Sequence, residues 1–397
     1  MNYRTNRNNS NQLSILGFGI MRLPSKNGAI DEPRAIAMIR HAVDEGINYF
    51  DTAYIYHRGK SEALLGKALA GHARRKVFIA TKLPTYMVGS LEGAKKIFET
   101  QLKRLQTDYI DYYLLHMLVD KAMFDRMVSL GVMTWLERLK ENGIIHNIGF
   151  SFHGVKADFE ALLKAYPWDF CQIQYNYLDE NSQATKAGLL MAADMGIPVI
   201  VMEPLRGGRL VTHLPAEVKR EFETFDPKRS SAQWALRWVW NHPQVTVVLS
   251  GMSDEAQLEE NIAVAGDARA DMMSEDELAM FSRVKEIILE KTKVPCTGCA
   301  YCMPCPHGVD IPECFSYYNE KHLMNDKMAK FRYMRNLGGL AVNPSNASQC
   351  VACGKCESQC PQSIEIIKEL KNVSREMEGP LYRPIVWLSR KMMRIKG

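Results

Sequence analysis

Residues 47–82, INYFDTAYIYHRGKSEALLGKALAGHARRKVFIATK, contain the pattern on which the fold prediction rests. Two short runs rich in β-branched and aromatic residues, INYF at 47–50 and VFIAT at 77–81, flank a segment with helical spacing at 61–70. Such runs are typical of buried parallel strands, and the segment between them is typical of a crossover helix. The stretch therefore predicts a strand–helix–strand unit.

The same alternation continues on both sides of this stretch. Further strands are predicted at six apolar runs: 15–20, 110–115, 145–149, 170–174, 197–202 and 245–249. Further helices are predicted where the apolar spacing is helical: 34–45, 91–105, 130–142, 155–165, 183–195 and 231–241. Eight strands alternating with helices predict an α/β protein with a (β/α)8 TIM barrel. A doubly wound sheet is the alternative, and it is disfavoured because no GxGxxG fingerprint follows the first strand.

Composition and charge restrict the class of protein. Of the 397 residues, 46% are hydrophobic and 24% are charged, which is ordinary for a globular chain and argues against disordered, collagen-like and coiled-coil proteins. No run approaches the roughly 18–20 apolar residues of a membrane span, and the N-terminal sequence has no apolar signal-peptide core. We therefore expect a soluble, cytoplasmic protein without a transmembrane segment.

The positive charge is concentrated at the C-terminus. Residues 371–397 contain seven Lys or Arg and two Glu, a balance of +5, which equals the net charge of the whole chain. A body with no net positive charge is not expected to bind nucleic acid. Residues 371–397 are predicted to form a basic amphipathic tail, which either lies on an anionic membrane or a partner or, more simply, covers the protein's own domains.

The cysteines divide the chain. Nine of the ten follow Pro295, and only Cys171 precedes it. Because clustered cysteines in a chain without a secretory signal are more often metal ligands than disulfides, we place a boundary near residue 290. The predicted domains are a barrel at 1–290, a cysteine-rich domain at 291–370 and the tail at 371–397.

Polar residues follow three of the predicted strands. Asp51 and Tyr56 follow the second strand, Lys82 the third and His116 the fourth. Catalytic residues of TIM barrels lie at the C-terminal ends of strands. Each residue alone has a structural explanation, as a helix cap, a solvated lysine or a packed histidine. All four at three strand ends instead indicate a catalytic site.

These four residue types suit the reduction of a carbonyl. Hydride transfer to a carbonyl places charge on its oxygen, which requires a proton donor. A free tyrosine has a pKa of about 10, and a nearby ammonium lowers that pKa because it stabilises the tyrosinate. An aspartate can keep the lysine charged and in place, and a histidine can orient the carbonyl. The set predicts a general-acid site that needs no metal.

Motifs from residue 13 to residue 266 resemble the aldo-keto reductases. They include DTAYIY at 51–56, SEALLGKAL at 61–69, TKLP at 81–84, DYIDYYLLH at 108–116, QIQYN at 172–176, GIPVIVMEPLRGGRL at 196–210 and SAQWALRWVWNHP at 231–243. The resemblance implies a (β/α)8 barrel, NAD(P)H bound without a Rossmann domain, and conversion of a carbonyl to an alcohol or the reverse. It implies catalysis by Asp51, Tyr56, Lys82 and His116, with Tyr56 as the proton donor.

The resemblance also implies a dinucleotide site. Ser151 and Gln172 match the positions that hold the nicotinamide carboxamide, although Phe152 replaces the asparagine that usually follows the serine. Met202 replaces the aromatic residue that often stacks on the nicotinamide, and a thioether can pack on a flat ring. Gln257 stands where many members have an arginine for the 2′-phosphate, and branches with glutamine still use NADPH. We expect NADP(H), with NAD(H) as the alternative.

The remaining dinucleotide positions implied by the resemblance fall into two groups. The backbone of the pyrophosphate loop is matched by three residues: Leu205, Gly207 and Gly208. The adenosine side is matched by four residues: Ser250, Gly251, Gln257 and Asn261.

The cysteine groups have iron–sulfur spacing. Residues 350–361 have the C-x2-C-x2-C-x3-C-P spacing of a [4Fe–4S] site, and residues 296–306 are one residue shorter in the last gap. In two-cluster ferredoxins the fourth cysteine of each group ligates the other cluster. We therefore predict one cluster on Cys296, Cys299, Cys302 and Cys360, and a second on Cys350, Cys353, Cys356 and Cys305. Zinc is the alternative, but paired C-x2-C zinc motifs do not explain triple cysteines with C-P endings.

The rest of the cysteine-rich domain is predicted to be helical. Residues 311–337 separate the two cysteine groups and have helical character. The domain therefore resembles the mainly α-helical two-cluster ferredoxins that are attached to oxidoreductases. Cys314 exceeds the eight expected ligands, and we expect it to be a buried thiol or, as the alternative, an exchanged ligand.

Two functional hypotheses remain. One is an NAD(P)H-dependent oxidoreductase acting on a small carbonyl or alcohol, with an accessory iron–sulfur domain. The other is a redox-sensing or electron-transfer subunit that uses the barrel as a cofactor-binding scaffold. Nicotinamide transfers two electrons as hydride, a cluster carries one, and the chain contains no flavin fingerprint. Three roles of the clusters are therefore left open: a structural role, sensing of the redox state, or electron exchange with a redox partner, which would be a flavoprotein or a ferredoxin.

Overall fold

The computed structural model describes all residues except 27, 155, 213, 324–327, 340–343, 381, 383, 385 and 387–397, and omits the side chain of residue 72. By its own contacts the chain divides into two compact units. The first contains residues 1–205 and 232–274. The second contains residues 206–231 and the described residues from 275 onward.

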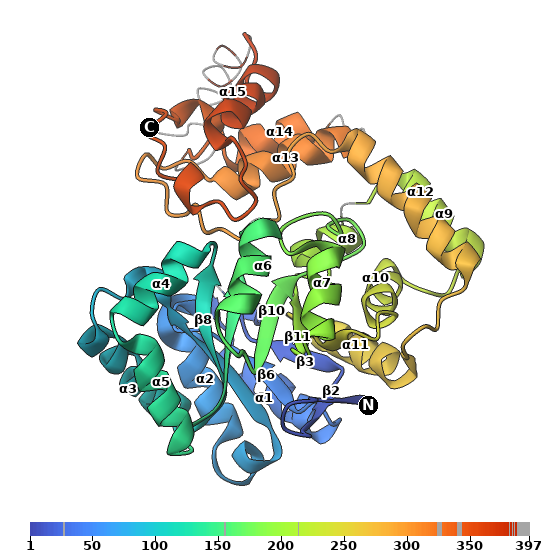
Figure 1. Cartoon of the computed structure of the whole chain (residues 1–397). Helices are drawn as coiled ribbons and strands as arrows, with labels where there is room; N and C mark the ends of the chain where they lie inside the picture. Colours follow the sequence, from blue (N-terminus) through green and yellow to red (C-terminus); the bar gives the residue numbers. More distant parts are fainter. Residues whose placement is uncertain are drawn as a thin grey trace. The chain divides into compact units, whose positions relative to one another are not determined.

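The first unit is a closed barrel of eight parallel strands (Figure 1). Around the barrel these are β3 (Leu16–Gly19), β6 (Tyr49–Asp51), β7 (Phe78–Pro84), β8 (Ile110–Leu118), β9 (Ile145–Phe152), β10 (Phe170–Gln174), β11 (Val199–Met202) and β12 (Val245–Ser250). The eight predicted strands are confirmed. The doubly wound alternative is wrong, because β12 pairs with β3, with Val248 opposite Leu16, and so closes the sheet.

Helices with one apolar face follow the strands. They are α1 (Glu32–Asp44), α2 (Lys60–Leu69), α3 (Leu91–Leu105), α4 (Lys121–Ser129), α5 (Val132–Glu141), α6 (Lys156–Ala165), α7 (Thr185–Asp194), α10 (Ser231–Trp240) and α11 (Glu255–Asp267). Side-chain caps mark three of their starts, since Ser90, Asp120 and Asp254 each accept a hydrogen bond from a backbone N–H three residues on. The helices α4 and α11 were not predicted. Short 3₁₀ turns are η1 (Tyr56–Gly59), η2 (Gly71–Lys76) and η3 (Thr85–Met87).

The N-terminal end of the barrel is filled by aromatic side chains. The Tyr112 ring lies 5.2 Å from the Tyr49 ring and 5.0 Å from the Phe170 ring, and all three residues are fully buried. A hairpin of β1 (Tyr3–Thr5) and β2 (Gln12–Ser14) contributes Leu13 to this core, and Asn6 Nδ2 donates a hydrogen bond to Tyr112 Oη (3.0 Å). A polar site in the barrel is therefore expected at the opposite end, where the strands have their C-termini. A second hairpin joins β4 (Ser25–Lys26) and β5 (Ala29–Ile30).

The second unit takes part of its sequence from the barrel region. Its helix α9 (Ala216–Phe225) packs on α12 (Glu275–Lys291), with the Phe222 and Phe281 rings 5.8 Å apart and a Lys291–Glu217 ion pair at 2.7 Å. Preceding α9 are η4 (Arg206–Gly208) and α8 (Arg209–Thr212). The predicted boundary near residue 290 stays a prediction. The compact unit that carries the cysteines begins earlier, because the α9–α12 contact adds both helices to it.

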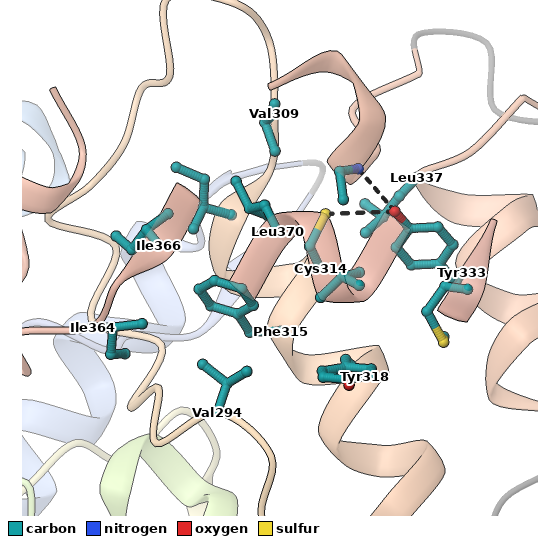
Figure 2. Packing of buried hydrophobic residues seen from close by; sticks show 14 of the residues in the cluster. Val294, Val309, Cys314, Phe315, Tyr318, Tyr333, Leu337, Ile364, Ile366 and Leu370 are labelled. Atoms are coloured by element: carbon teal, nitrogen blue, oxygen red, sulfur yellow. Dashed lines mark hydrogen bonds between the residues drawn. The ribbon is translucent and has the colours of Figure 1, made fainter. Parts of the chain in front are cut away.

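Three helices form the core beside the cysteines. They are α13 (Ile311–Leu323), α14 (Ala329–Asn336) and α15 (Ile366–Met377), with η5 (Ala347–Gln349) and η6 (Glu357–Gln359) in the cysteine loops. Phe315, Tyr333 and Leu370 from the three helices are buried together (Figure 2). The predicted helical character of 311–337 is confirmed for its described residues. Of the predicted tail at 371–397, residues 371–377 continue α15, and 387–397 lie outside the described residues.

None of the described helices has the length and apolar character that crossing a membrane requires.

Candidate functional site

The four residues of the predicted catalytic set lie at the C-terminal end of the barrel strands. Asp51 is the last residue of β6, Lys82 lies in β7 and His116 in β8, while Tyr56 begins η1 after β6. The strands β6, β7 and β8 are neighbours in parallel register, so their C-terminal ends meet at one edge. The structure therefore brings these residues together, as expected for a barrel active site.

Asp51 and Lys82 form a buried ion pair. Lys82 Nζ donates hydrogen bonds to Asp51 Oδ1 (2.6 Å) and to the Thr52 carbonyl (2.8 Å), and the two charged side chains are only 1% and 4% exposed. Burial lowers the pKa of Lys82, whereas the carboxylate of Asp51 acts to raise it. Burial raises the pKa of Asp51, and Lys82 opposes that shift. Each residue thus keeps the other charged in a site that disfavours charge.

Tyr56 and His116 lie beside this pair. Lys82 Nζ is 5.0 Å from the centroid of the Tyr56 ring, and the rings of Tyr56 and His116 meet edge to face at 6.1 Å. Burial, together with the positive charge of Lys82, holds the pKa of His116 well below its usual range. His116 is therefore a neutral imidazole at neutral pH. An ammonium, a phenol and a neutral imidazole converge, which is the arrangement expected for proton donation to a carbonyl oxygen.

A buried carboxylate behind Lys82 was not predicted from the sequence. Glu62 on α2 is fully buried, and its Oε1 accepts hydrogen bonds from Thr81 Oγ1 (2.7 Å) and Gln101 Nε2 (2.8 Å). Gln101 Nε2 also donates to the Lys82 carbonyl (3.0 Å). The other carboxylate oxygen of Glu62 pairs with Arg104 Nη1 (3.0 Å). Glu62 and Gln101 therefore fix the backbone of β7 where it carries Lys82.

Arg104 extends this support to the loop of Tyr56. Its Nη1 donates a hydrogen bond to the Tyr54 carbonyl (3.1 Å), and its guanidinium lies over the Tyr54 ring. His57, Arg58 and Gly59 have φ values of 50°, 58° and 84°, a run of left-handed backbone directly after Tyr56. Such conformations are strained in non-glycine residues and persist where the surroundings hold them. Arg104 contributes to that hold, because a Cβ on Gly59 would lie 2.7 Å from its guanidinium.

The predicted nicotinamide residues occupy neighbouring strands. Ser151 on β9 lies directly opposite Gln172 on β10, and Met202 ends β11. Ser151 Oγ accepts a hydrogen bond from the Met117 N–H (2.9 Å), and Gln172 Nε2 lies 3.5 Å from Met202 Sδ. Among the described residues, the buried Gln172 Oε1 has no hydrogen-bond partner. Gln172 Oε1 is therefore available to accept a hydrogen bond from the NH2 group of a carboxamide.

Of the residues predicted for the adenosine side, Ser250 ends β12, Gly251 follows it, and Gln257 and Asn261 lie in the first half of α11. Asn261 Nδ2 donates a hydrogen bond to Ser250 Oγ (2.9 Å), and both residues are buried. The side chain of Gln257 folds back on its own turn: its Oε1 accepts from the Ser253 N–H (2.9 Å). Gly251 packs on Arg22. Of the predicted pyrophosphate residues, Leu205 belongs to the first unit, and Gly207 and Gly208 in η4 belong to the second.

The two cysteine groups share several features of their local backbone. The second and fourth residues after the first cysteine of each group are left-handed, as is the third residue after the last cysteine. In the first group these are Gly298, Ala300 and Gly308, and in the second Ala352, Gly354 and Ser363. The helices α13 and α15 begin six residues after the last cysteine of their groups. The cysteine-rich region is thus an internal repeat, which the sequence spacing alone did not establish.

The last cysteine of each group lies near cysteines of the other group. Cys296, Cys299, Cys302 and Cys360 line one cavity, with Phe315 and Ile311 on its apolar side. In the other group, Cys350 and Cys305 are the thiols that act electrostatically on Cys356, and Cys353 is exposed in the same loop. Among the described residues, no three His, Cys, Asp or Glu side chains are arranged to hold a single metal ion. The cavity between the four thiols has the ligand chemistry that a larger thiolate-bound centre needs.

Comparison with known proteins identifies both regions. The model of the aldo/keto reductase family matches residues 15–279, and a model described as a 4Fe-4S dicluster domain matches residues 295–365. The first match covers more than half of the chain. The chain belongs to the aldo/keto reductase family. The resemblance noted in the motifs is confirmed, as is the barrel followed by a domain of the two-cluster type.

Curated and solved aldo/keto reductases resemble the barrel region. The chain is 30% identical over 306 residues to L-galactose dehydrogenase of Arabidopsis thaliana, covering 71% of this chain and 92% of that protein. It is 28% identical over 314 residues to NADH-specific methylglyoxal reductase of Escherichia coli, covering 66% and 94%. A holo aldo-keto reductase structure from Bacillus halodurans superposes with a TM-score of 0.60 at 27% identity, covering 72% of this chain and 96% of that one.

This aldo/keto reductase has a second histidine near its candidate site that sequence reasoning missed. His153 follows β9 and is buried, and its Nδ1 lies 3.2 Å from Gln183 Oε1. Gln183 Nε2 in turn donates to Gln174 Oε1 (2.8 Å). Burial lowers the pKa of His153 to about 4, and Lys82 acts on it in the same direction. A neutral imidazole therefore lies within the electrostatic range of Lys82 of the predicted catalytic set. Its sequence signal was only weak, because His153 lies four residues after the predicted strand at 145–149 and directly after the observed one.

Cys314 lies in the core of the second unit rather than in a cysteine loop. It is fully buried, with its Sγ 3.9 Å from Tyr333 Oη (Figure 2). Tyr333 Oη also accepts a hydrogen bond from the Ala347 N–H (2.8 Å) and donates one to Glu378 Oε1 (2.6 Å). Burial raises the pKa of the Cys314 thiol far above its ordinary value. These surroundings are those of a structural thiol, as expected.

Proposed function

We propose that this chain is an NAD(P)H-dependent oxidoreductase that reduces a carbonyl to an alcohol, or catalyses the reverse, with an accessory iron–sulfur domain. The observation that carries the proposal is the buried Lys82–Asp51 pair, 2.6 Å apart, beside the Tyr56 ring. Two relatives in the family carry the names of a dehydrogenase and a reductase, which supports the same reaction class.

Each residue of the set has a role that follows from its surroundings. Tyr56 donates the proton to the carbonyl oxygen, and the adjacent ammonium of Lys82 stabilises the tyrosinate that remains. Asp51 keeps Lys82 charged and oriented. His116, neutral at this site, donates or accepts a hydrogen bond at the substrate oxygen without adding charge. Glu62 and Arg104 are positioning residues for Lys82 and for the Tyr56 loop.

NADP(H) is the proposed dinucleotide, with NAD(H) as the alternative. Ser151 and the unpartnered Oε1 of Gln172 suit the nicotinamide carboxamide, with Met202 packing nearby. The bound dinucleotide supplies or accepts the hydride. We assign the pyrophosphate to the backbone at Leu205, Gly207 and Gly208. The adenosine side is assigned to Ser250, Gly251, Gln257 and Asn261. The substrate is a small carbonyl or alcohol.

We further propose two [4Fe–4S] clusters with crossed ligands. One is held by Cys296, Cys299, Cys302 and Cys360, and the other by Cys350, Cys353, Cys356 and Cys305. The cavity bordered by the first four thiols supports this assignment. The exposure of Cys353 favours a second candidate function, in which the clusters exchange electrons with a flavoprotein or ferredoxin partner.

The substitution Tyr56→Phe tests the catalytic assignment. Turnover of a carbonyl panel with NADPH under anaerobic conditions should fall by about 10²–10⁴-fold, the usual contribution of a positioned acid. NADPH affinity, measured by fluorescence titration, should change little. Tyr109→Phe, which alters a tyrosine stacked on His146, is the matched control and should retain full turnover. Undiminished turnover in the Tyr56 variant would refute the role of Tyr56.

A further inference from the structure

The segment at 206–209 contacts the start of the first cysteine group. Arg206 Nη2 donates a hydrogen bond to the Pro295 carbonyl (3.1 Å), and Arg209 Nη1 donates one to the Cys296 carbonyl (2.9 Å). A Cβ on Gly298 would lie 3.1 Å from Arg209 Nη2, so this guanidinium also packs on the turn after Cys296. Two arginines from one short segment therefore hold the backbone around a proposed cluster ligand.

The two guanidiniums also bring positive charge to this ligand. Both are close enough to act electrostatically on the Cys296 sulfur. Arg206 is buried, so water and salt screen its charge only weakly. The Gly298 N–H lies 3.4 Å from Cys296 Sγ and donates to it. Net charge and hydrogen bonds to the sulfurs set the reduction potential of an iron–sulfur cluster. These contacts are therefore of the kind that tunes such a potential.

The backbone between the arginines has the form of an anion-binding turn. Arg206, Gly207 and Gly208 have consecutive φ values of 46°, 67° and 91°. A left-handed arginine is strained unless its surroundings hold it, and the hydrogen bond to Pro295 is part of that hold. Gly207 is exposed, and among the described residues nothing lies within 4 Å of a Cβ on Gly208. Successive N–H groups in such turns form concave sites for anions.

We infer that the 206–209 segment, which lies wholly in the second unit, couples an anion to the first cluster, so that a dinucleotide pyrophosphate bound at Gly207 and Gly208 shifts the reduction potential of that cluster. The inference rests on the proposed function, which assigns Gly207 and Gly208 to the pyrophosphate. It adds a sensing role to the iron–sulfur domain, because the potential of the cluster then reports whether the dinucleotide site is occupied.

The sign of the shift follows from charge. Reduction adds one negative charge near Cys296, and the pyrophosphate adds negative charge at Gly207 and Gly208. Both negative charges are stabilised by the same two guanidiniums, those of Arg206 and Arg209, and they repel each other. Dinucleotide binding therefore makes the cluster harder to reduce, and its potential becomes more negative. By linkage, the reduced cluster weakens dinucleotide binding by the same factor. A roughly tenfold weakening corresponds to about 59 mV for a one-electron couple.

The test is an EPR-monitored redox titration of the anaerobically purified full-length protein. The ligand is 2′-phospho-ADP-ribose, which has the pyrophosphate but no nicotinamide and so cannot accept hydride. Calorimetry first establishes that it binds. With saturating ligand, one of the two cluster potentials should become more negative by about 59 mV, and the other should stay unchanged. Binding without any shift would overturn the inference. If neither 2′-phospho-ADP-ribose nor ADP-ribose, the corresponding ligand for an NAD(H) site, binds, the proposed dinucleotide site itself is refuted.

Variants of Arg209 separate charge from structure. Arg209→Met should make the same potential more negative without ligand and should remove most of the ligand-induced shift. Arg209→Lys keeps the positive charge, so the cluster potential measured without ligand should stay at the wild-type value. If Arg209→Met binds less iron than wild type, Arg209→Lys is the variant in which the ligand-induced shift is measured, and that shift should be retained. Arg283→Met removes an equal charge from an arginine that pairs with Glu221, and it should leave both potentials unchanged. A full ligand-induced shift in Arg209→Met would contradict the proposed link.

Discussion

Replacing Asp51 by asparagine tests the buried ion pair directly. Asparagine has the same shape and can still accept the hydrogen bond from Lys82 Nζ, so the substitution removes only the charge. Lys82 is 1% exposed, and loss of one partner of a buried pair costs about 3–5 kcal/mol because the remaining charge is uncompensated. The free energy of unfolding at neutral pH should therefore fall by about 3 kcal/mol or more.

The pH dependence of that loss identifies its cause. Without Asp51, burial lowers the pKa of Lys82 further below its unfolded value of about 10.4, so the unfolded chain binds more protons than the folded chain between the two pKa values. Stability of Asp51→Asn relative to wild type should therefore rise as pH increases from 7 toward 10. Denaturant unfolding of the full-length protein across this range measures it. A loss below 1 kcal/mol, or one independent of pH, would refute the ion-pair argument.

Two further predictions concern the support of the site and the cysteines. Glu62→Gln should lower kcat by roughly ten- to hundredfold with little change in NADPH affinity, because it loosens the backbone of Lys82 and the loop of Tyr56. Steady-state kinetics and a separate NADPH titration measure the two effects. An unchanged kcat would contradict this role of Glu62. Anaerobically purified protein should contain about eight iron atoms per chain, the sum of two four-iron clusters; elemental analysis that finds zinc and no iron would exclude the assignment.

The barrel and its polar strand ends could be predicted because both depend on local patterns. Buried parallel strands appear as short apolar runs, and Asp51, Lys82 and His116 directly follow or end such runs. No tertiary information is needed to place these residues at one edge, since parallel strands point the same way. The same argument did not find His153, because the predicted strand at 145–149 ends three residues before the observed one.

The supporting network could not be predicted, because it depends on packing between helices. Glu62 and Arg104 lie on α2 and α3 among other charged residues, and nothing in their spacing marks Glu62 as buried or Arg104 as half-buried. Only the contact of the two helices with β7 brings them to Lys82. The assignment of 206–231 to the second unit escaped prediction for the same reason, since it depends on the packing of α9 against α12.

The repeated backbone of the two cysteine groups has a consequence for how this unit can change. Left-handed residues recur at matching places, and α13 and α15 begin at the same distance from the last cysteines, so the two loop-and-helix segments are structurally similar copies. Yet Cys360 of the second copy lies with Cys296, Cys299 and Cys302 of the first. With the proposed ligands, each cluster takes cysteines from both copies. Deletion or replacement of one copy would therefore remove ligands from both clusters, and neither copy can bind its cluster alone. With these ligands, we expect the two clusters to assemble together.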